Sequence, residues 1–128
     1  MVVLDAPKIE RSRLRQEARQ RLAAYTAGLQ AVVRQVVNLV HPLRVILFGS
    51  QARGDARPES DWDLMVVMPV GAARNRTALK LYGSVRRNGL PCEFFVSTPG
   101  DFERYAYHPS LVYKHVLEEG VDMYVDED

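Results

Sequence analysis

The chain has 128 residues, 47% of them hydrophobic, which is the size of one domain with a single core. Its 17 basic residues nearly balance its 16 acidic residues, so the overall charge does not favour binding to nucleic acid or membrane lipid. A single cysteine, Cys92, excludes an internal disulfide, and no apolar stretch reaches the roughly 18 residues of a membrane span. We therefore expect one domain over residues 1–128, located in the cytoplasm, with no membrane partner and no direct contact with nucleic acid.

The N-terminal third is predicted to be helical. Residues 1–8 contain Pro7 and few strong contacts, so we expect them to fray. Over residues 9–40, apolar side chains recur at spacings of three and four, which predicts an amphipathic helical segment. A break at 26–28 into two helices is left open. Pro42 ends the segment, because the residue before a proline is pushed out of the helical region.

A set of arginines gathers on this segment, with Arg11, Arg15 and Arg19 on one side of the helix, whereas the chain ends in acidic residues at 126–128. Such a charge run is usually a solvated face. A contact surface for RNA or for an acidic protein is the alternative, and the sequence does not choose between them.

Short apolar runs bounded by turn residues predict the remaining elements. Thr98 can cap a helix that has Pro99 in its first turn, and Asn88-Gly89 can end the helix before it. The order of elements predicts an α/β (α+β) sheet with helices on one side. The expected strands are 44–48, 63–68, 92–97 and 121–125, and the expected helices are 50–54, 72–87, 101–107 and 110–119.

Two acids, Asp61 and Asp63, stand at the start of the second predicted strand. Side chains alternate along a strand, so the two carboxylates are expected on one face and Trp62 on the other. A single aspartate here could be a turn cap. Two like charges on one face, however, raise each other's cost of ionising, and a divalent metal that carries a phosphate would relieve that cost.

Two further features could complete such a site. Gly49-Ser50 ends the first strand, where glycine lets a phosphate approach the backbone and the next residues offer N–H groups and a hydroxyl. Glu93 opens the third strand and could hold a second ion or accept a proton from an attacking hydroxyl. The alternative for Glu93 is an exposed acid at a strand end.

The central motif carries a resemblance. Gly49-Ser50, ten intervening residues and then Asp61-x-Asp63 resembles the signature of the DNA polymerase beta-like nucleotidyltransferase superfamily. With Phe48 before it and Gln51 to Gly54 after it, at this chain length, the motif is similar to that of the minimal nucleotidyltransferase (MNT) branch. The resemblance runs from about residue 29 to residue 124 and implies a short mixed β-sheet with helices packed against it.

The resemblance also implies roles for these residues. Gly49 and Ser50 would hold the triphosphate of ATP. Arg53 lies in the motif helix, from which it could reach a phosphate or an acid of another chain. Asp61 and Asp63 would bind two magnesium ions. Glu93 occupies the place of the family's third acid, which is usually an aspartate, and its extra methylene moves the carboxylate by about one bond length.

Members of the MNT branch commonly pair with a small HEPN-domain RNase toxin. The resemblance therefore implies an antitoxin that transfers AMP from ATP to a tyrosine of that partner. The alternatives are a catalytically silent antitoxin that masks the toxin, and adenylyl transfer to a small hydroxylated molecule such as an aminoglycoside. Oligomeric state is left open, a homo-oligomer included.

An aromatic cluster near the C-terminus could form the contact surface for such a partner. Core packing is the preferred interpretation of the same side chains. The residues are Tyr105, Tyr107, Leu111, Val112 and Tyr113.

Overall fold

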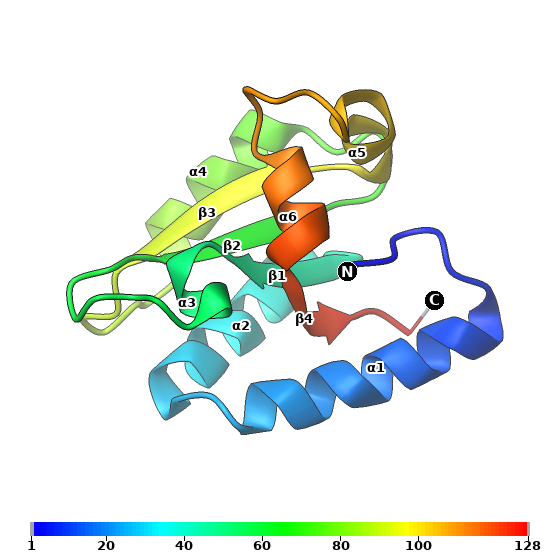
Figure 1. The fold of residues 1–128 in the computed structure, drawn as a ribbon. Helices are drawn as coiled ribbons and strands as arrows, with labels where there is room; N and C mark the ends of the chain where they lie inside the picture. The colour runs from blue at the N-terminus through cyan, green and yellow to red at the C-terminus, as the bar shows by residue number, and fades with distance from the viewer. Residues whose placement is uncertain (1, 128) are drawn as a thin grey trace.

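The computed structural model describes residues 2–127 and shows a four-stranded sheet with helices packed against it (Figure 1). This confirms the predicted α+β class. No helix in the described range is both long and apolar enough to span a membrane. The strands are β1 (Arg44–Phe48), β2 (Trp62–Val67), β3 (Cys92–Ser97) and β4 (Val121–Val125), and the helices are α1 (Lys8–Ala23), α2 (Ala27–Val40), α3 (Ser50–Arg53), α4 (Arg74–Ser84), α5 (Pro99–Tyr105) and α6 (Tyr113–Glu119).

The sheet is mixed, with strand order β3-β2-β1-β4. β1 runs antiparallel to both β2 and β4, whereas β2 and β3 are parallel. The crossover between the two parallel strands contains α4, the usual way to connect parallel neighbours. Because β2 and β3 point the same way, their N-terminal ends lie at the same edge of the sheet, and each of these ends carries an acid.

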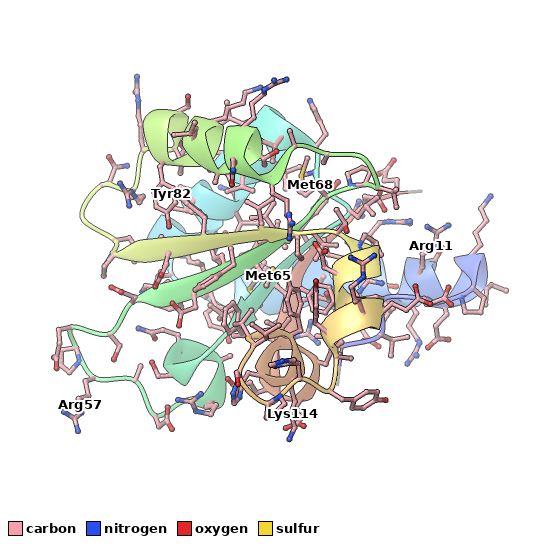
Figure 2. The ribbon with its side chains drawn as sticks, turned by 90° about the horizontal axis from the view of Figure 1, so that it is seen from above. Arg11, Arg57, Met65, Met68, Tyr82 and Lys114 are labelled. Carbon is pink, nitrogen blue, oxygen red and sulfur yellow. The ribbon has the colours of Figure 1, made fainter. Side chains whose placement is uncertain are left out.

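Helices cover both faces of the sheet, so the prediction of helices on one side is wrong. One core cluster combines Val45 and Leu47 of β1 with residues of α2 and α4. A second combines Ile46 and Phe48 with residues of α5 and α6. Seen from above, Tyr82 of α4 and the α6 residue Lys114 lie on opposite sides of the sheet (Figure 2). The physical reason is that all five residues of β1 are buried, which requires cover on both faces.

The N-terminal segment forms two helices, which settles the break left open at 26–28. Thr26 caps α2, with its side chain accepting a hydrogen bond from the Leu29 N–H at 3.3 Å. α2 ends where His41 adopts a left-handed conformation with φ of 50° before Pro42, as the proline predicted.

Residues expected to fray are anchored instead. Val2 is buried in the second core cluster, and its N–H donates to the Leu117 carbonyl at 3.1 Å. The Val3 carbonyl accepts a hydrogen bond at 2.7 Å from the buried guanidinium of Arg44, which also pairs with Asp122 at 3.2 Å. The segment is held because it covers apolar side chains of the sheet. Residue 1 lies outside the described residues.

Arginines on α1 contact the C-terminal end of the chain. Arg15 donates to the carbonyls of Asp126 and Glu127 at 3.0 and 2.8 Å, and Arg19 forms an ion pair with Glu127 at 3.5 Å. Part of the basic set is therefore used within the chain. Residue 128 of the acidic tail lies outside the described residues.

Helix α4 is shorter than the predicted 72–87. It ends at Ser84 because the Gln35 side chain takes up both backbone groups of Arg86, accepting from its N–H at 2.7 Å and donating to its carbonyl at 2.9 Å. Thr98 and Asp101 form the capping box that starts α5, two residues before the predicted start. α6 starts at Tyr113, later than the predicted 110, whereas β1, β3 and β4 have the predicted bounds.

Candidate active site

The turn after β1 is shaped by Gly49. Its φ of 78° and ψ of −159° fall in a region that essentially only glycine adopts. Its carbonyl accepts hydrogen bonds from the N–H groups of Ala52 and Arg53, both at 3.0 Å. A Cβ built on Gly49 would lie 2.5 Å from Oδ2 of Asp63. Glycine is therefore needed here for the backbone angles and for the close approach of a carboxylate, and Ser50 follows directly as the first residue of α3.

Asp63 and Glu93 lie side by side on the parallel strands. Their Cα atoms are register partners, and the partner of Asp63 on its other side is Phe48 of β1. Asp63 is half-buried, whereas Glu93 is exposed. The fold thus brings together two of the three predicted acids and the Gly49 turn.

The third acid, Asp61, lies just outside the strand, because β2 begins at Trp62. Its side chain is exposed. The connection around it is held at both ends: Gln51 donates to the Ser60 carbonyl at 3.3 Å, and the Trp62 N–H donates to the Pro91 carbonyl at 2.7 Å. Strand alternation therefore fixes the direction of Asp63 but does not by itself fix that of Asp61.

The electrostatics of Asp63 reflect its neighbours. Its pKa is raised from 3.8 to about 6, first by burial and then by the negative charges of Glu93 and Asp61. The charge of Arg53 acts in the opposite direction. Removing water and crowding carboxylates both penalise the ionised form, and a cation at this place would relieve both effects.

The donor chemistry suits Mg²⁺, a hard cation that prefers carboxylate oxygens. No group of three or more His, Cys, Asp or Glu side chains in residues 2–127 is arranged to hold a metal ion by itself. Mg²⁺ is, however, commonly held by one or two carboxylates together with the phosphates of a substrate. Asp63 and Glu93 fit that mode of binding, and the predicted three-acid set stays a prediction.

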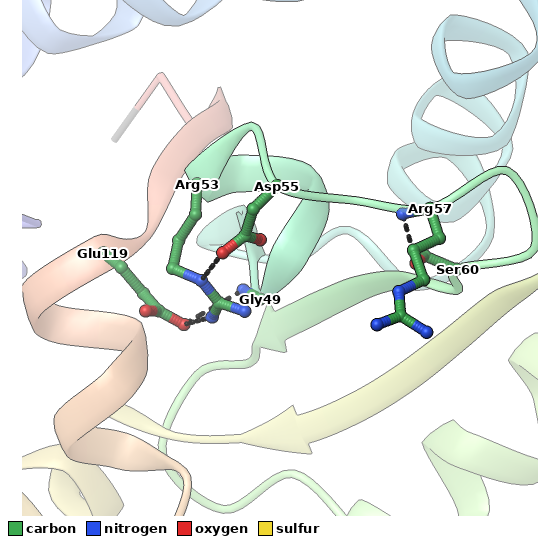
Figure 3. Close-up of polar contacts among 6 residues, drawn as sticks. All are labelled: Gly49, Arg53, Asp55, Arg57, Ser60 and Glu119. Atoms are coloured by element: carbon green, nitrogen blue, oxygen red, sulfur yellow. Dashed lines mark hydrogen bonds and ion pairs between the residues drawn. The ribbon is translucent and has the colours of Figure 1, made fainter.

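Sequence reasoning missed a residue at this turn, Glu119, the last residue of α6. Its Oε1 accepts the Gly49 N–H at 3.2 Å and Nη1 of Arg53 at 3.0 Å (Figure 3). Arg53 also donates from Nε to Oδ2 of Asp55 at 3.2 Å. Both acids raise the pKa of Arg53. One sequence signal was available, because an acid in the last turn of a helix is unfavourable for the helix dipole.

Comparison with known proteins identifies the family. The family model described as the nucleotidyltransferase domain matches residues 29–122, well over half of the chain. The chain belongs to the nucleotidyltransferase domain family. The match includes the Gly49 turn, all three predicted acids and Glu119.

A solved structure supports the fold of this nucleotidyltransferase domain. The crystal structure of a candidate nucleotidyltransferase from Sulfolobus solfataricus superposes with a TM-score of 0.52 and 20% sequence identity. The alignment covers 99% of this chain and 96% of that one. No curated protein sequence matches the chain. Nucleotidyl transfer is therefore the general chemistry of this family, and the likeness to the solved structure concerns the fold.

Two residues near the acids serve the packing of the nucleotidyltransferase domain. Trp62 is half-buried against the first core cluster, on the face opposite Asp63, with its ring 6.0 Å from that of Tyr25 in an edge-on contact. Cys92 is buried, and burial raises the pKa of its thiol to about 11. A thiol with so high a pKa is a poor nucleophile at neutral pH, which agrees with a packing role.

The predicted aromatic contact surface is divided between core and exterior. Tyr113 packs on Phe102 with ring centroids 4.9 Å apart, and Tyr105 stacks on Tyr113 at 5.7 Å. Val112 also contacts the second core cluster. Tyr107 alone among the large side chains of this set is strongly exposed, at 92%. Core packing thus accounts for much of the cluster.

Proposed function

We propose that this chain is a Mg²⁺-dependent nucleotidyltransferase that transfers AMP from ATP to a tyrosine hydroxyl of a HEPN-domain RNase toxin, and that it is the antitoxin of that toxin in the cytoplasm. The observation that carries the proposal is the contact between Asp63 and the Gly49 turn. In this contact a carboxylate, which can bind a metal ion, lies next to a glycine turn, which can bind a phosphate.

The donors for the triphosphate are the Gly49 N–H, the Ser50 hydroxyl and the Arg53 guanidinium. A guanidinium matches the geometry of phosphate oxygens and stays charged at every physiological pH. Asp61 and Asp63 would hold magnesium, which when bound neutralises phosphate oxygens and steadies the departing pyrophosphate. With a pKa of about 6, Asp63 is mostly ionised at neutral pH and so is available as a ligand.

In the transfer, the acceptor oxygen forms a bond to the α-phosphorus of ATP while the bond from that phosphorus to the β-phosphate oxygen breaks. Pyrophosphate leaves, and the acceptor loses its proton. Glu93, exposed beside Asp63 in the register of the sheet, is the proposed proton acceptor or ligand of the second ion.

The nature of the partner rests on the resemblance of the motif to the MNT branch. The test incubates the chain with a HEPN-domain protein encoded next to it, ATP labelled on the α-phosphate, and Mg²⁺. We expect label on a tyrosine of the partner together with loss of its RNase activity. Asp61→Asn combined with Asp63→Asn should abolish the label while the far-ultraviolet circular dichroism stays that of the wild type.

Two other outcomes would redirect the assignment. Full labelling by the double variant would contradict the assignment of Asp61 and Asp63 as magnesium ligands. Stoichiometric inhibition of the RNase without any label would indicate a silent binding antitoxin, in which the acids are remnants of a catalytic site.

A further inference from the structure

The Glu119 carboxylate sits on the donors that the proposed function assigns to the triphosphate. A single oxygen, Oε1, accepts hydrogen bonds from the Gly49 N–H and from Arg53 (Figure 3). One bond connects α6 to the Gly49 turn and the other connects it to the end of α3, which are far from α6 in the chain. An anionic oxygen that receives one backbone N–H and one guanidinium has the hydrogen-bonding environment of a bound phosphate oxygen.

Glu119 is not placed there by the needs of its own helix. As the last residue of α6 it adds negative charge at the negative end of the helix dipole, which destabilises a helix. Its negative charge also acts on Asp63, raising the pKa of that carboxyl further. The carboxylate is therefore unfavourable for its own helix and for the ionised form of Asp63, and favourable toward Gly49 and Arg53.

We propose that the Glu119 carboxylate is an internal competitor of the nucleotide, which occupies the Gly49 N–H and the Arg53 guanidinium in the free protein and is displaced when a triphosphate binds. The inference rests on the proposed function. In this proposal Glu119 sets the affinity for the nucleotide. Its carboxylate takes the hydrogen bonds from Gly49 and Arg53 that a phosphate would otherwise receive.

The displacement requires movement of the side chain and not of the helix. The Glu119 side chain is 20% exposed, so it borders on solvent and can rotate outward. The backbone after it is fixed, because a Cβ on Gly120 would lie 2.7 Å from Cγ2 of Ile46 and would also overlap the Val116 carbonyl. Arg53 keeps Asp55 as a partner while it exchanges Glu119 for a phosphate.

The test compares Glu119→Gln with the wild type in calorimetric titrations of MgATP, inorganic triphosphate with Mg²⁺, and adenosine. The amide keeps the shape and removes the charge. We expect about tenfold tighter binding of MgATP and of triphosphate, the lower end of the effect of one hydrogen bond to a charged group. Adenosine should show no gain, because it carries no phosphate.

The matched control is Glu118→Gln, which removes the neighbouring charge of the same helix. Glu118 is exposed and pairs with Lys114 at 3.9 Å, away from the Gly49 turn. Its affinity for MgATP should stay that of the wild type. A second variant, Glu119→Asp, retracts the carboxylate by one methylene and should show a smaller gain, which keeps the test informative if Glu119→Gln unfolds.

The outcomes separate this inference from the proposed function. Wild type that binds MgATP, with Glu119→Gln and Glu119→Asp binding equally or more weakly, would overturn the inference and leave the proposed function standing. Absence of MgATP binding in the wild type and in both Glu119 variants would overturn the proposed function, and the inference with it. An equal gain in Glu118→Gln would show a general charge effect and would also overturn the inference.

Discussion

The carboxylate of Asp63 lies directly against the backbone of Gly49: a Cβ at Gly49 would be 2.5 Å from Oδ2. The contact lies where the end of β1 meets the start of β2. These strands are antiparallel, and Phe48 and Asp63 are register partners. The Asp63 side chain can therefore keep this position only if residue 49 has no Cβ.

Gly49→Ala should lower the free energy of unfolding by about 1–3 kcal/mol through backbone strain, and the clash with Asp63 should add to this and abolish MgATP binding. Gly54→Ala is the matched control. Gly54 also has a positive φ, 85°, but a Cβ there meets no atom within 4 Å. It should cost about 1–2 kcal/mol and leave MgATP binding in place. Equal loss of binding in both variants would contradict a specific role for the Gly49–Asp63 contact.

Asp63 should make stability depend on pH. Because its pKa is raised from 3.8 to about 6 in the folded protein, the folded state holds the proton more tightly than the unfolded state does. The associated stability is fully present below about pH 4 and is lost as the pH rises through 6. Asp63→Asn should therefore be more stable than wild type above pH 6, by about 1 kcal/mol after allowance for the half-exposed position, and not at pH 4.

Urea unfolding of both proteins at pH 4, 5, 6, 7 and 8 measures this difference. Glu103→Gln, at an exposed site on α5, is the control and should stay within about 0.5 kcal/mol of wild type. A difference between Asp63→Asn and wild type that does not change with pH would refute the raised pKa.

Glu93 should be the main charged cause of that raised pKa. Glu93→Gln is expected to lower the pKa of Asp63, and Asp61→Asn to lower it less, since Glu93 has the larger effect of the two acids. Glu93→Asp keeps the charge and should leave the pKa close to that of the wild type. Carbon-13 NMR titration of the side-chain carboxyl of Asp63 gives its pKa in the wild type and in the three variants. An unchanged pKa in Glu93→Gln would mean that the register pairing does not bring these carboxylates into contact.

The buried pair of Arg44 and Asp122 should contribute strongly to stability where the edge strand β4 pairs with β1. Their side chains are 4% and 7% exposed, and burial raises the pKa of Asp122 while Arg44 opposes that rise. Asp122→Asn leaves a buried guanidinium without its counter-charge, which should cost about 3 kcal/mol in urea unfolding. The exposed control Glu118→Gln should cost less than about 0.5 kcal/mol. A loss below 1 kcal/mol for Asp122→Asn would show that the Val3 carbonyl alone satisfies Arg44.

Much of the fold could be predicted because its signals are local. β1, β3 and β4 are apolar runs between turn residues, and Thr98 with Pro99 marks the start of α5. The acids at the starts of β2 and β3 were predicted to lie at one site, and the parallel pairing of Asp63 with Glu93 brings those two together. The continuous apolar run of β1 from Val45 to Phe48 could have predicted helices on both faces, since a strand covered on one face alternates apolar and polar residues.

What the sequence could not supply depends on contacts between distant residues. Helix α4 ends where the Gln35 side chain forms hydrogen bonds with the backbone of Arg86. No local sequence pattern predicts this pairing. Likewise, the unfavourable position of Glu119 at a helix end is visible in the sequence, but its contact with the distant Gly49 appears only in the folded structure. The predicted site therefore lacked the residue that accepts hydrogen bonds from both Gly49 and Arg53.

Transfer of AMP to the partner can be tested with two preparations of ATP, labelled on the α- or on the γ-phosphate, with Mg²⁺ and the HEPN-domain partner. We expect that only the α-label becomes bound to the partner, that one pyrophosphate is released for each label bound, and that Asp63→Asn prevents both. Binding of the γ-label to the partner, or undiminished α-labelling by Asp63→Asn, would contradict it.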